Sequence, residues 1–269
     1  MVVLVVSLGY YLGRSHLGLP LDFTALLLLA AGTALSGGGA CSFNQYRERE
    51  YDAMMVRTMN RPLPTGALTP KEVFAFAAAI SISGILILLS IGLLPAMLAA
   101  ATELLYVGLY TSLKRVTPAN TIIGSVPGAL PIAGGWAAGT GGLEIEALVL
   151  FAIMFFWQPP HFYSIATIYA ADYARAGYQM LPVVDLDGTR LRRETLGFLA
   201  LLFFSALLPA FIGLAGSTYA VLAALLSALF FVAGVSFCRA PQTKARMMFR
   251  ASILYIPLLA AAFVIDGCK

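Results

Sequence analysis

The segment FNQYREREYDAMMVRTMNRPLP, residues Phe43–Pro64, concentrates charge in a chain that is otherwise strongly apolar. The 269-residue sequence is 60% hydrophobic and 11% charged, yet this segment holds seven charged side chains of both signs. The mean hydropathy of +0.86 is typical of an integral membrane protein. The segment follows an apolar run directly, so it is expected to lie where a membrane helix leaves the bilayer.

Working outward from this segment, the apolar runs predict an all-α, polytopic membrane protein with about nine transmembrane helices in a single domain over residues 1–269. A spanning helix needs roughly 20 mostly apolar residues. The expected helices are Met1–Gly13, Leu21–Phe43, Val73–Ile91, Leu94–Leu113, Ala119–Ala138, Leu143–Tyr169, Leu196–Gly216, Tyr219–Cys238 and Met247–Ile265. The first is too short to cross a hydrocarbon core of about 30 Å, which favours a true start further upstream.

The basic residues indicate how these helices are oriented. Fifteen of the 17 Lys and Arg residues fall in the loops after the second, fourth, sixth and eighth helices. Because basic loops stay in the cytoplasm, these loops are expected to be cytoplasmic and the protein to lie in the cell (inner) membrane. The net charge of +4 is therefore explained by topology, and no nucleic-acid partner is indicated.

Three oxygen-bearing side chains of the charged segment share one spacing. Asn44, Glu48 and Asp52 recur every four residues, so they would form one stripe if the second helix continued to Asp52. Carboxylate and amide oxygens suit Mg²⁺, which is usually held together with phosphates. Arg57 and Arg61 would add guanidinium contacts to a diphosphate. The alternative is a solvated interfacial helix with ion pairs along it, and Arg47 and Arg49 are most readily explained by topology alone.

Other membrane-proximal ionisable residues are further candidates. Lys114 and Arg115 end the fourth helix, and His161 follows Pro159–Pro160 inside the sixth, where the prolines predict a helix break. The alternative for His161 is a structural hydrogen bond across that break. An ionisable residue inside a membrane segment is a functional candidate by default.

Two acidic residues complete the set of candidates. Asp172 is expected to serve the site, the alternative being a helix-end carboxylate paired with Arg175. Glu103 lies within a membrane helix and is expected to be structural, hydrogen-bonded to another helix.

At this point the sequence resembles a known family. "NQYREREYDAMMVRTMNRPLPTG" resembles the N-x-x-x-D-x-x-x-D signature of the UbiA superfamily of intramembrane prenyltransferases, and in particular its heme O synthase branch. The blocks "YTSLKRVTPANTIIGSVPGALPIAGGWAAGTG", "WQPPHF", "DYARAGYQMLPVV" and "FRASILYIPLLAAAFVID" follow in the order of that branch. The resemblance covers nearly the whole chain.

The resemblance implies helices around a central cavity, capped by cytoplasmic loops that hold Mg²⁺ and an isoprenyl diphosphate. It implies transfer of the farnesyl group of farnesyl diphosphate to the 2-vinyl group of heme B, with addition of water, giving heme O. The implied partners are heme B, farnesyl diphosphate and the lipid bilayer, with a downstream heme-modifying enzyme or oxidase assembly machinery as a further candidate.

The resemblance also assigns roles residue by residue. The implied metal ligands are Asn44, Glu48, Asp52 and Asp172. These four and His161 are the implied catalytic residues, and the implied diphosphate ligands are Arg57, Arg61, Lys114, Arg115 and Arg175. Two departures stand out: Glu48 replaces the Asp of the signature, and the second motif keeps the single acid Asp172, which leaves the number of Mg²⁺ ions open.

Two other functions remain open from the sequence. One is a prenyltransferase of the same superfamily that acts on a quinone precursor or another aromatic acceptor. The other is a non-catalytic membrane transporter or heme-handling protein, because transporters also combine broken helices with charged loops. The roles of His161 as an iron ligand, a water-handling residue or a structural residue are also left undecided.

Overall fold

The computed structural model describes residues 1–266, and over that range its regular elements are all helices. In chain order they are α1 (Val2–His16), α2 (Phe23–Asp52), α3 (Pro70–Ile91), α4 (Leu93–Glu103), the π-helix η1 (Leu104–Tyr110), α5 (Thr111–Leu113), α6 (Asn120–Thr140), α7 (Ile145–Ile168), α8 (Ala170–Arg175), α9 (Leu181–Val184), α10 (Thr189–Phe211), α11 (Ser217–Arg239) and α12 (Pro241–Asp266).

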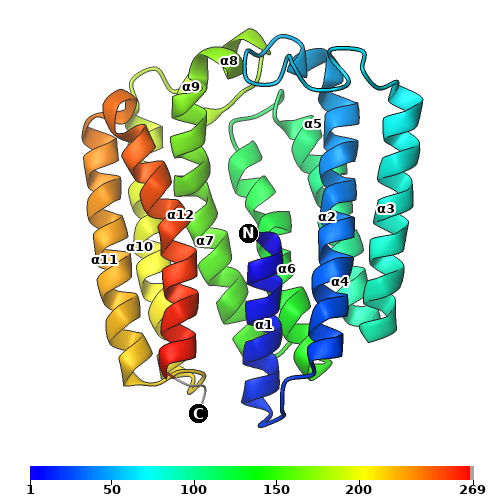
Figure 1. Cartoon of the computed structure of the whole chain (residues 1–269). Coiled ribbons are helices and arrows are strands. Elements are labelled where there is room, and N and C mark those ends of the chain that lie inside the picture. The colour runs from blue at the N-terminus through cyan, green and yellow to red at the C-terminus, as the bar shows by residue number, and fades with distance from the viewer. Residues whose placement is uncertain (267–269) are drawn as a thin grey trace.

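The expectation of about nine membrane helices is confirmed. Within residues 1–266, eight helical segments are long and apolar enough to cross a membrane, with α4, η1 and α5 forming one of them. The first expected helix corresponds to α1, which has 15 residues, fewer than a spanning helix needs, and begins halfway up the molecule (Figure 1). The long helices stand side by side, and α7 and α6 run through the middle of the arrangement.

One end of the molecule carries most of the polar chain. The connections that follow α2, α5, α7 and α11 all lie at the upper end in Figure 1, where α8 and α9 also lie. These are the connections predicted to share one side of the membrane. The short links at the lower end are poor in basic residues, so the charge asymmetry of the sequence coincides with the two ends of the helices.

Several helices extend beyond their apolar runs. The helix α2 continues nine residues past Phe43 to Asp52, and α10 begins at Thr189 rather than at Leu196. Charged residues such as Arg and Glu have good helix propensity, so helices predicted from hydropathy alone are too short at their charged ends. For α2 the extension meets the condition under which Asn44, Glu48 and Asp52 form one stripe.

The helix break predicted at Pro159–Pro160 is wrong, because α7 runs without interruption from Ile145 to Ile168. Both prolines are buried, and the Gln158 amide donates hydrogen bonds to the carbonyl oxygens of Ser125 and Met154 (both 3.1 Å). Neighbouring helices and polar side chains can support a membrane helix through a proline turn. The two prolines therefore lie within a continuous, closely packed helix rather than at a break.

Glycines allow α1 and α6 to pack in direct backbone contact. A Cβ on Gly135 of α6 would overlap the carbonyl oxygen of Val6, and one on Gly9 of α1 would overlap that of Ile132. Small residues at such positions let membrane helices approach closely. The glycine- and proline-rich sequence of α6 therefore provides close packing, and α6 is unbroken despite Pro127 and Pro131.

This contact predicts opposite effects for two adjacent glycines. Gly135→Ala should lower the thermal unfolding midpoint and the folded yield in detergent, because the new methyl group meets the α1 backbone. Gly134→Ala is the matched control, since its nearest neighbour would be Leu98 Cβ at 3.9 Å and alanine favours the helix by about 1 kcal/mol. Equal midpoints for the two variants would contradict the proposed packing.

Candidate active site

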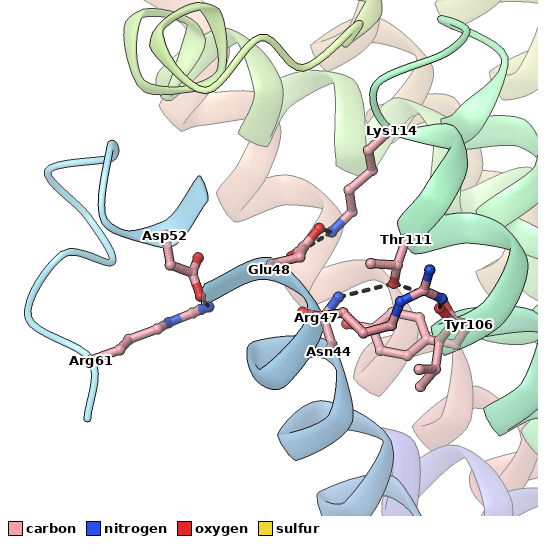
Figure 2. Close-up of polar contacts among 9 residues, drawn as sticks. Asn44, Arg47, Glu48, Asp52, Arg61, Tyr106, Thr111 and Lys114 are labelled. Carbon is pink, nitrogen blue, oxygen red and sulfur yellow. Dashed lines mark hydrogen bonds and ion pairs between the residues drawn. The ribbon is translucent and has the colours of Figure 1, made fainter. Parts of the chain in front are cut away.

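Asn44, Glu48 and Asp52 lie on one buried face at the upper end of α2. Their exposed fractions are 7%, 5% and 1%. Figure 2 shows that they project from successive turns toward different segments of the chain. The solvated interfacial helix considered from the sequence does not describe these three residues, because they are enclosed by the protein.

Each residue of the stripe has its own partner. The Asn44 amide donates to Thr111 Oγ1 (3.0 Å), and Lys114 Nζ lies 2.8 and 3.1 Å from the two carboxylate oxygens of Glu48. These contacts join α2 to the end of the fourth membrane span, as Figure 2 shows. Glu48 and Lys114 thereby form an ion pair with both side chains largely buried.

Asp52 is tied to the loop that follows it but keeps one oxygen without a partner. Arg61 donates to Asp52 Oδ2 (2.7 Å), and Thr58 Oγ1 donates to the Asp52 backbone carbonyl (2.9 Å). Asp52 Oδ1 is buried and accepts no hydrogen bond within the described residues. Buried polar atoms usually have a hydrogen-bond partner, so this oxygen is able to accept one from a bound group.

Asp172 of α8 holds the loop between α2 and α3. Its two carboxylate oxygens accept hydrogen bonds from the backbone N–H groups of Val56 and Arg57 (3.2 Å each), and Arg175 forms an ion pair with it. The pair with Arg175, one of the alternatives left open by the sequence, is therefore present. These bonds position Arg57, whereas the metal-binding role of Asp172 stays a prediction.

The candidate cations rest on tyrosine rings that the sequence did not single out. Arg57 lies over Tyr169 (5.1 Å to the ring centroid), Lys114 over Tyr110 (4.8 Å) and Arg115 over Tyr51 (4.5 Å). Such cation–π contacts orient a cation without neutralising it. Tyr110 precedes Lys114 by four residues, which is a signal visible in the sequence. The other two pairs join distant segments and depend on how the loops fold.

Tyr178 closes the polar region from the α8–α9 connection. It is 2% exposed, it packs against Tyr51 and Tyr173, and its hydroxyl has no hydrogen-bond partner within the described chain. Burial and the neighbouring Glu48 carboxylate raise the pKa of Tyr178 well above its usual value. The hydroxyl therefore stays protonated and is available as a donor.

Two cavities lie near the upper end of α2, and Glu48 is the member of the stripe that lines one of them. A polar cavity of about 440 Å³ is lined by Glu48, Tyr51, Arg115 and Tyr178, among others. A mainly apolar cavity of about 500 Å³ lies between α1, α2, η1, α6 and α7, and its lining residues include His161. The first suits an anionic group and the second an apolar one.

His161 reaches the apolar cavity in a defined orientation. Its Nδ1 lies 2.7 Å from Ser252 Oγ, and that hydroxyl donates to the Phe249 carbonyl (2.6 Å). The tautomer with the proton on His161 Nδ1 fits both contacts, because Nδ1 then donates to Ser252 Oγ while that hydroxyl donates to Phe249. Its Nε2 then keeps a lone pair with no partner among the described residues. Stacking on Trp157 (4.7 Å between centroids) fixes the ring.

Glu103 lies apart from this site. Ser81 of α3 donates to its Oε1 (2.7 Å), while its Oε2 is buried without a hydrogen-bond partner in residues 1–266. The interhelical bond is the structural contact expected from the sequence.

The oxygens of the stripe suit a hard cation whose coordination sphere is completed by a bound ligand. Within residues 1–266, no group of three His, Cys, Asp or Glu side chains is arranged to hold a metal. However, Asp52 Oδ1 is buried and unpartnered, and Asn44 and Glu48 lie on the same face. Mg²⁺ is commonly bound by one or two carboxylates together with waters and substrate phosphates, which is the donor set that this arrangement offers.

Comparison with known proteins identifies the relatives of this chain. The model of the UbiA prenyltransferase family matches residues 2–255. The protoheme IX farnesyltransferase of Solibacter usitatus is 40% identical over 274 residues, which cover 99% of this chain and 94% of that protein.

Two solved structures share the fold. A structure of digeranylgeranylglyceryl phosphate synthase has a TM-score of 0.81 at 19% identity, covering 99% of this chain and 92% of that one. A UbiA homologue from Archaeoglobus fulgidus bound to GPP and Mg²⁺ has a TM-score of 0.63 at 15% identity, with 97% and 96% covered. The family resemblance of the sequence is confirmed, and this chain belongs to the UbiA prenyltransferase family.

Proposed function

We propose that this protein transfers the farnesyl group of farnesyl diphosphate to the 2-vinyl group of heme B, with addition of water, giving heme O and diphosphate. The observation that carries the proposal is that a cation-rich polar cavity and an apolar cavity lie beside the same segment of a membrane bundle, with Tyr110 lining the apolar cavity and Thr111 the polar one. That combination fits a substrate with an anionic head and a long apolar tail. The full-length likeness to a protoheme IX farnesyltransferase favours heme B over a quinone precursor as the acceptor.

The basic residues act on the diphosphate. Lys114 and Arg61 neutralise the buried carboxylates, and Arg57 and Arg115 lie over tyrosine rings with their charges free for an anion. Stabilising the charge that develops on a leaving group is usually the largest single catalytic contribution. These four residues therefore promote cleavage of the bond between C1 of the farnesyl chain and the diphosphate oxygen. Arg175 would add a more peripheral contact.

Asn44, Glu48 and Asp52 are the residues that would hold Mg²⁺, with the diphosphate completing its coordination. When bound, the ion would neutralise charge on the diphosphate oxygens. Glu48 and Asp52 are ion-paired with Lys114 and Arg61, so these pairs would have to loosen for the carboxylates to hold the ion. Lys114 and Arg61 would then be available to the same diphosphate. Asp172 serves this arrangement by anchoring the loop that carries Arg57.

The apolar cavity would host the farnesyl chain and the reacting edge of the heme. The terminal vinyl carbon forms the new bond to C1 of the farnesyl group, and a water molecule adds to the adjacent cationic carbon and loses a proton. His161 Nε2 is the basic atom in this cavity. It can orient or deprotonate that water, or bind the heme iron. Apolar walls keep bulk water from the reactive substrate.

We propose further that the protein lies in the cell (inner) membrane and that its polar end faces the cytoplasm. The basic residues of the four connections at that end support this orientation. A transporter or heme-handling role is the competing function, and it predicts no turnover of farnesyl diphosphate by the purified protein. Detection of heme O by mass analysis of extracted heme tests the proposal directly.

The metal hypothesis predicts a large difference between two acids of the same helix turn. Asp52→Asn should lower heme O formation more than about 100-fold, since it removes a charge needed at the metal, and EDTA should do the same to the wild type. Glu50→Gln is the matched control, because the Glu50 side chain is 72% exposed. Glu48→Asp should keep measurable activity. Full activity after both Asp52→Asn and EDTA treatment would refute the metal hypothesis.

The orientation predicts which cysteines react from outside the cell. In a variant without native cysteines, Thr65→Cys and Thr189→Cys should resist an impermeant maleimide in intact cells. Thr218→Cys, at the opposite end, should label. All three positions are exposed, so the pattern reports sidedness rather than burial. Efficient labelling of Thr65→Cys would reverse the orientation.

The role of His161 predicts separable losses. His161→Ala should lower turnover by about 10²–10⁴-fold if the residue handles water, with both substrates still bound. If it binds iron, the variant should instead lose heme affinity and shift the heme absorption spectrum, while farnesyl diphosphate binding is kept. Ser252→Ala removes the hydrogen-bond partner that orients the His161 ring. It should therefore cause a smaller loss of the same kind as His161→Ala. Wild-type rates in a folded His161→Ala protein would remove His161 from the site.

A further inference from the structure

The fourth membrane span contains an unusual turn beside the site. Residues Leu104–Tyr110 form the π-helix η1, flanked by α4 and α5, and the Thr111 N–H donates to the Tyr106 carbonyl five residues earlier. A π-helical turn inserts one extra residue into an α-helix, and such turns are rare and frequently found at functional sites. Side-chain directions after the turn differ by about 100° from those of an uninterrupted α-helix.

A single arginine from another helix contacts this turn at three points. Arg47 of α2 donates through Nη1 to the Val107 carbonyl and to the Gly108 carbonyl (3.3 Å), and through Nη2 to Ser112 Oγ (3.0 Å). Ser112 Oγ in turn donates to the Gly108 carbonyl (2.7 Å). Figure 2 shows Arg47 reaching across from α2 to this turn. No carboxylate within residues 1–266 pairs with Arg47.

The residues carried by the turn face both parts of the site. Tyr106 and Tyr110 line the apolar cavity, with their rings stacked 5.7 Å apart. Tyr110 is seated on Gly124, where a Cβ would come within 2.5 Å of the ring. One turn further on, Lys114 meets Glu48. The register of η1 thus determines the positions of Tyr106 and Tyr110 in the apolar cavity and of Lys114, a basic residue proposed to contact the diphosphate.

We infer that Arg47 is a positioning residue for the reaction. Its guanidinium fork holds the carbonyls of the π-helical turn, and this fixes Tyr106, Tyr110 and Lys114 in their places around the two cavities. The expected effect of Arg47 on turnover rests on the proposed function. Its expected effect on the stability of η1 does not. The role differs from the purely topogenic one that the sequence indicated for Arg47.

The neighbouring Arg49 provides a natural contrast. It has the same charge and lies on the same helix end, but its guanidinium contacts the Tyr46 carbonyl of its own helix and the carboxylate of Glu50. Arg47 also lines the polar cavity, whereas Arg49 does not. A direct contact between Arg47 and an anion would therefore lower activity without faster amide hydrogen exchange in residues 104–116, and Arg49→Gln controls for the loss of charge at this helix end. If Arg47 instead acts by holding η1, its loss should accelerate exchange there as well.

The test compares Arg47→Gln, Arg47→Lys and Arg49→Gln with the wild-type protein in one detergent. The first measurement is amide hydrogen exchange by mass spectrometry. Arg47→Gln should accelerate exchange about tenfold or more in peptides covering residues 104–116, the scale of a lost charge-assisted hydrogen bond. Peptides from α10 to α12 should be unchanged, and Arg49→Gln should match the wild type throughout.

The second measurement is steady-state kinetics. Arg47→Gln should raise KM for farnesyl diphosphate and lower kcat/KM by about 10- to 100-fold, because small misplacements of binding groups have effects of that size. Arg47→Lys keeps the charge but lacks the planar fork, so it should recover only part of the loss. Arg49→Gln should keep wild-type constants.

The outcomes separate the inference from the proposed function. Unchanged exchange in residues 104–116, uniform acceleration over the whole protein, or complete recovery with Arg47→Lys would each overturn the positioning role. Local acceleration with unchanged kinetics would overturn the link to catalysis. If the wild-type protein fails to turn over farnesyl diphosphate, the proposed function fails, and the exchange result still decides whether Arg47 holds η1.

Discussion

The ion pair between Glu48 and Lys114 is the contact on which the polar end of the molecule depends. Both side chains are largely buried, and removal of one partner from such a pair typically costs about 3–5 kcal/mol because the other charge is left unpaired. The pair joins the second and fourth membrane spans at the point where the chain leaves its apolar segments. It therefore fixes the distance between the carboxylate stripe of α2 and the basic end of α5.

The same constraint orders the loops above the helices. Buried polar groups must find partners inside the protein, and here the partners come from distant segments: Arg61 for Asp52, and the backbone of Val56 and Arg57 for Asp172. The loop between α2 and α3 is thus held at both its start and its middle. A connection that hydropathy marks only as polar becomes a defined cap over the bundle.

On the proposed function, this network would let one site hold both a metal and an anion. In the protein alone, the carboxylates and the cations neutralise one another, which lowers the cost of keeping them buried. On the proposed function, a diphosphate with its cation would offer each group a new partner of the opposite charge. Such an exchange would conserve the charge balance of the site, and the cation–π contacts would keep Arg57, Lys114 and Arg115 oriented.

The sequence by itself determined the membrane class, the number of helices, the end at which the charged connections gather, and the candidate stripe Asn44–Glu48–Asp52. These follow from hydropathy and a four-residue spacing, which are properties of one segment at a time. Tertiary structure alone decided that α7 stays continuous through Pro159–Pro160, that Asp172 accepts hydrogen bonds from the α2–α3 loop, and that Arg47 donates hydrogen bonds to a π-helical turn. Each of these depends on which atoms of another segment lie opposite, and no pattern within a single helix encodes that.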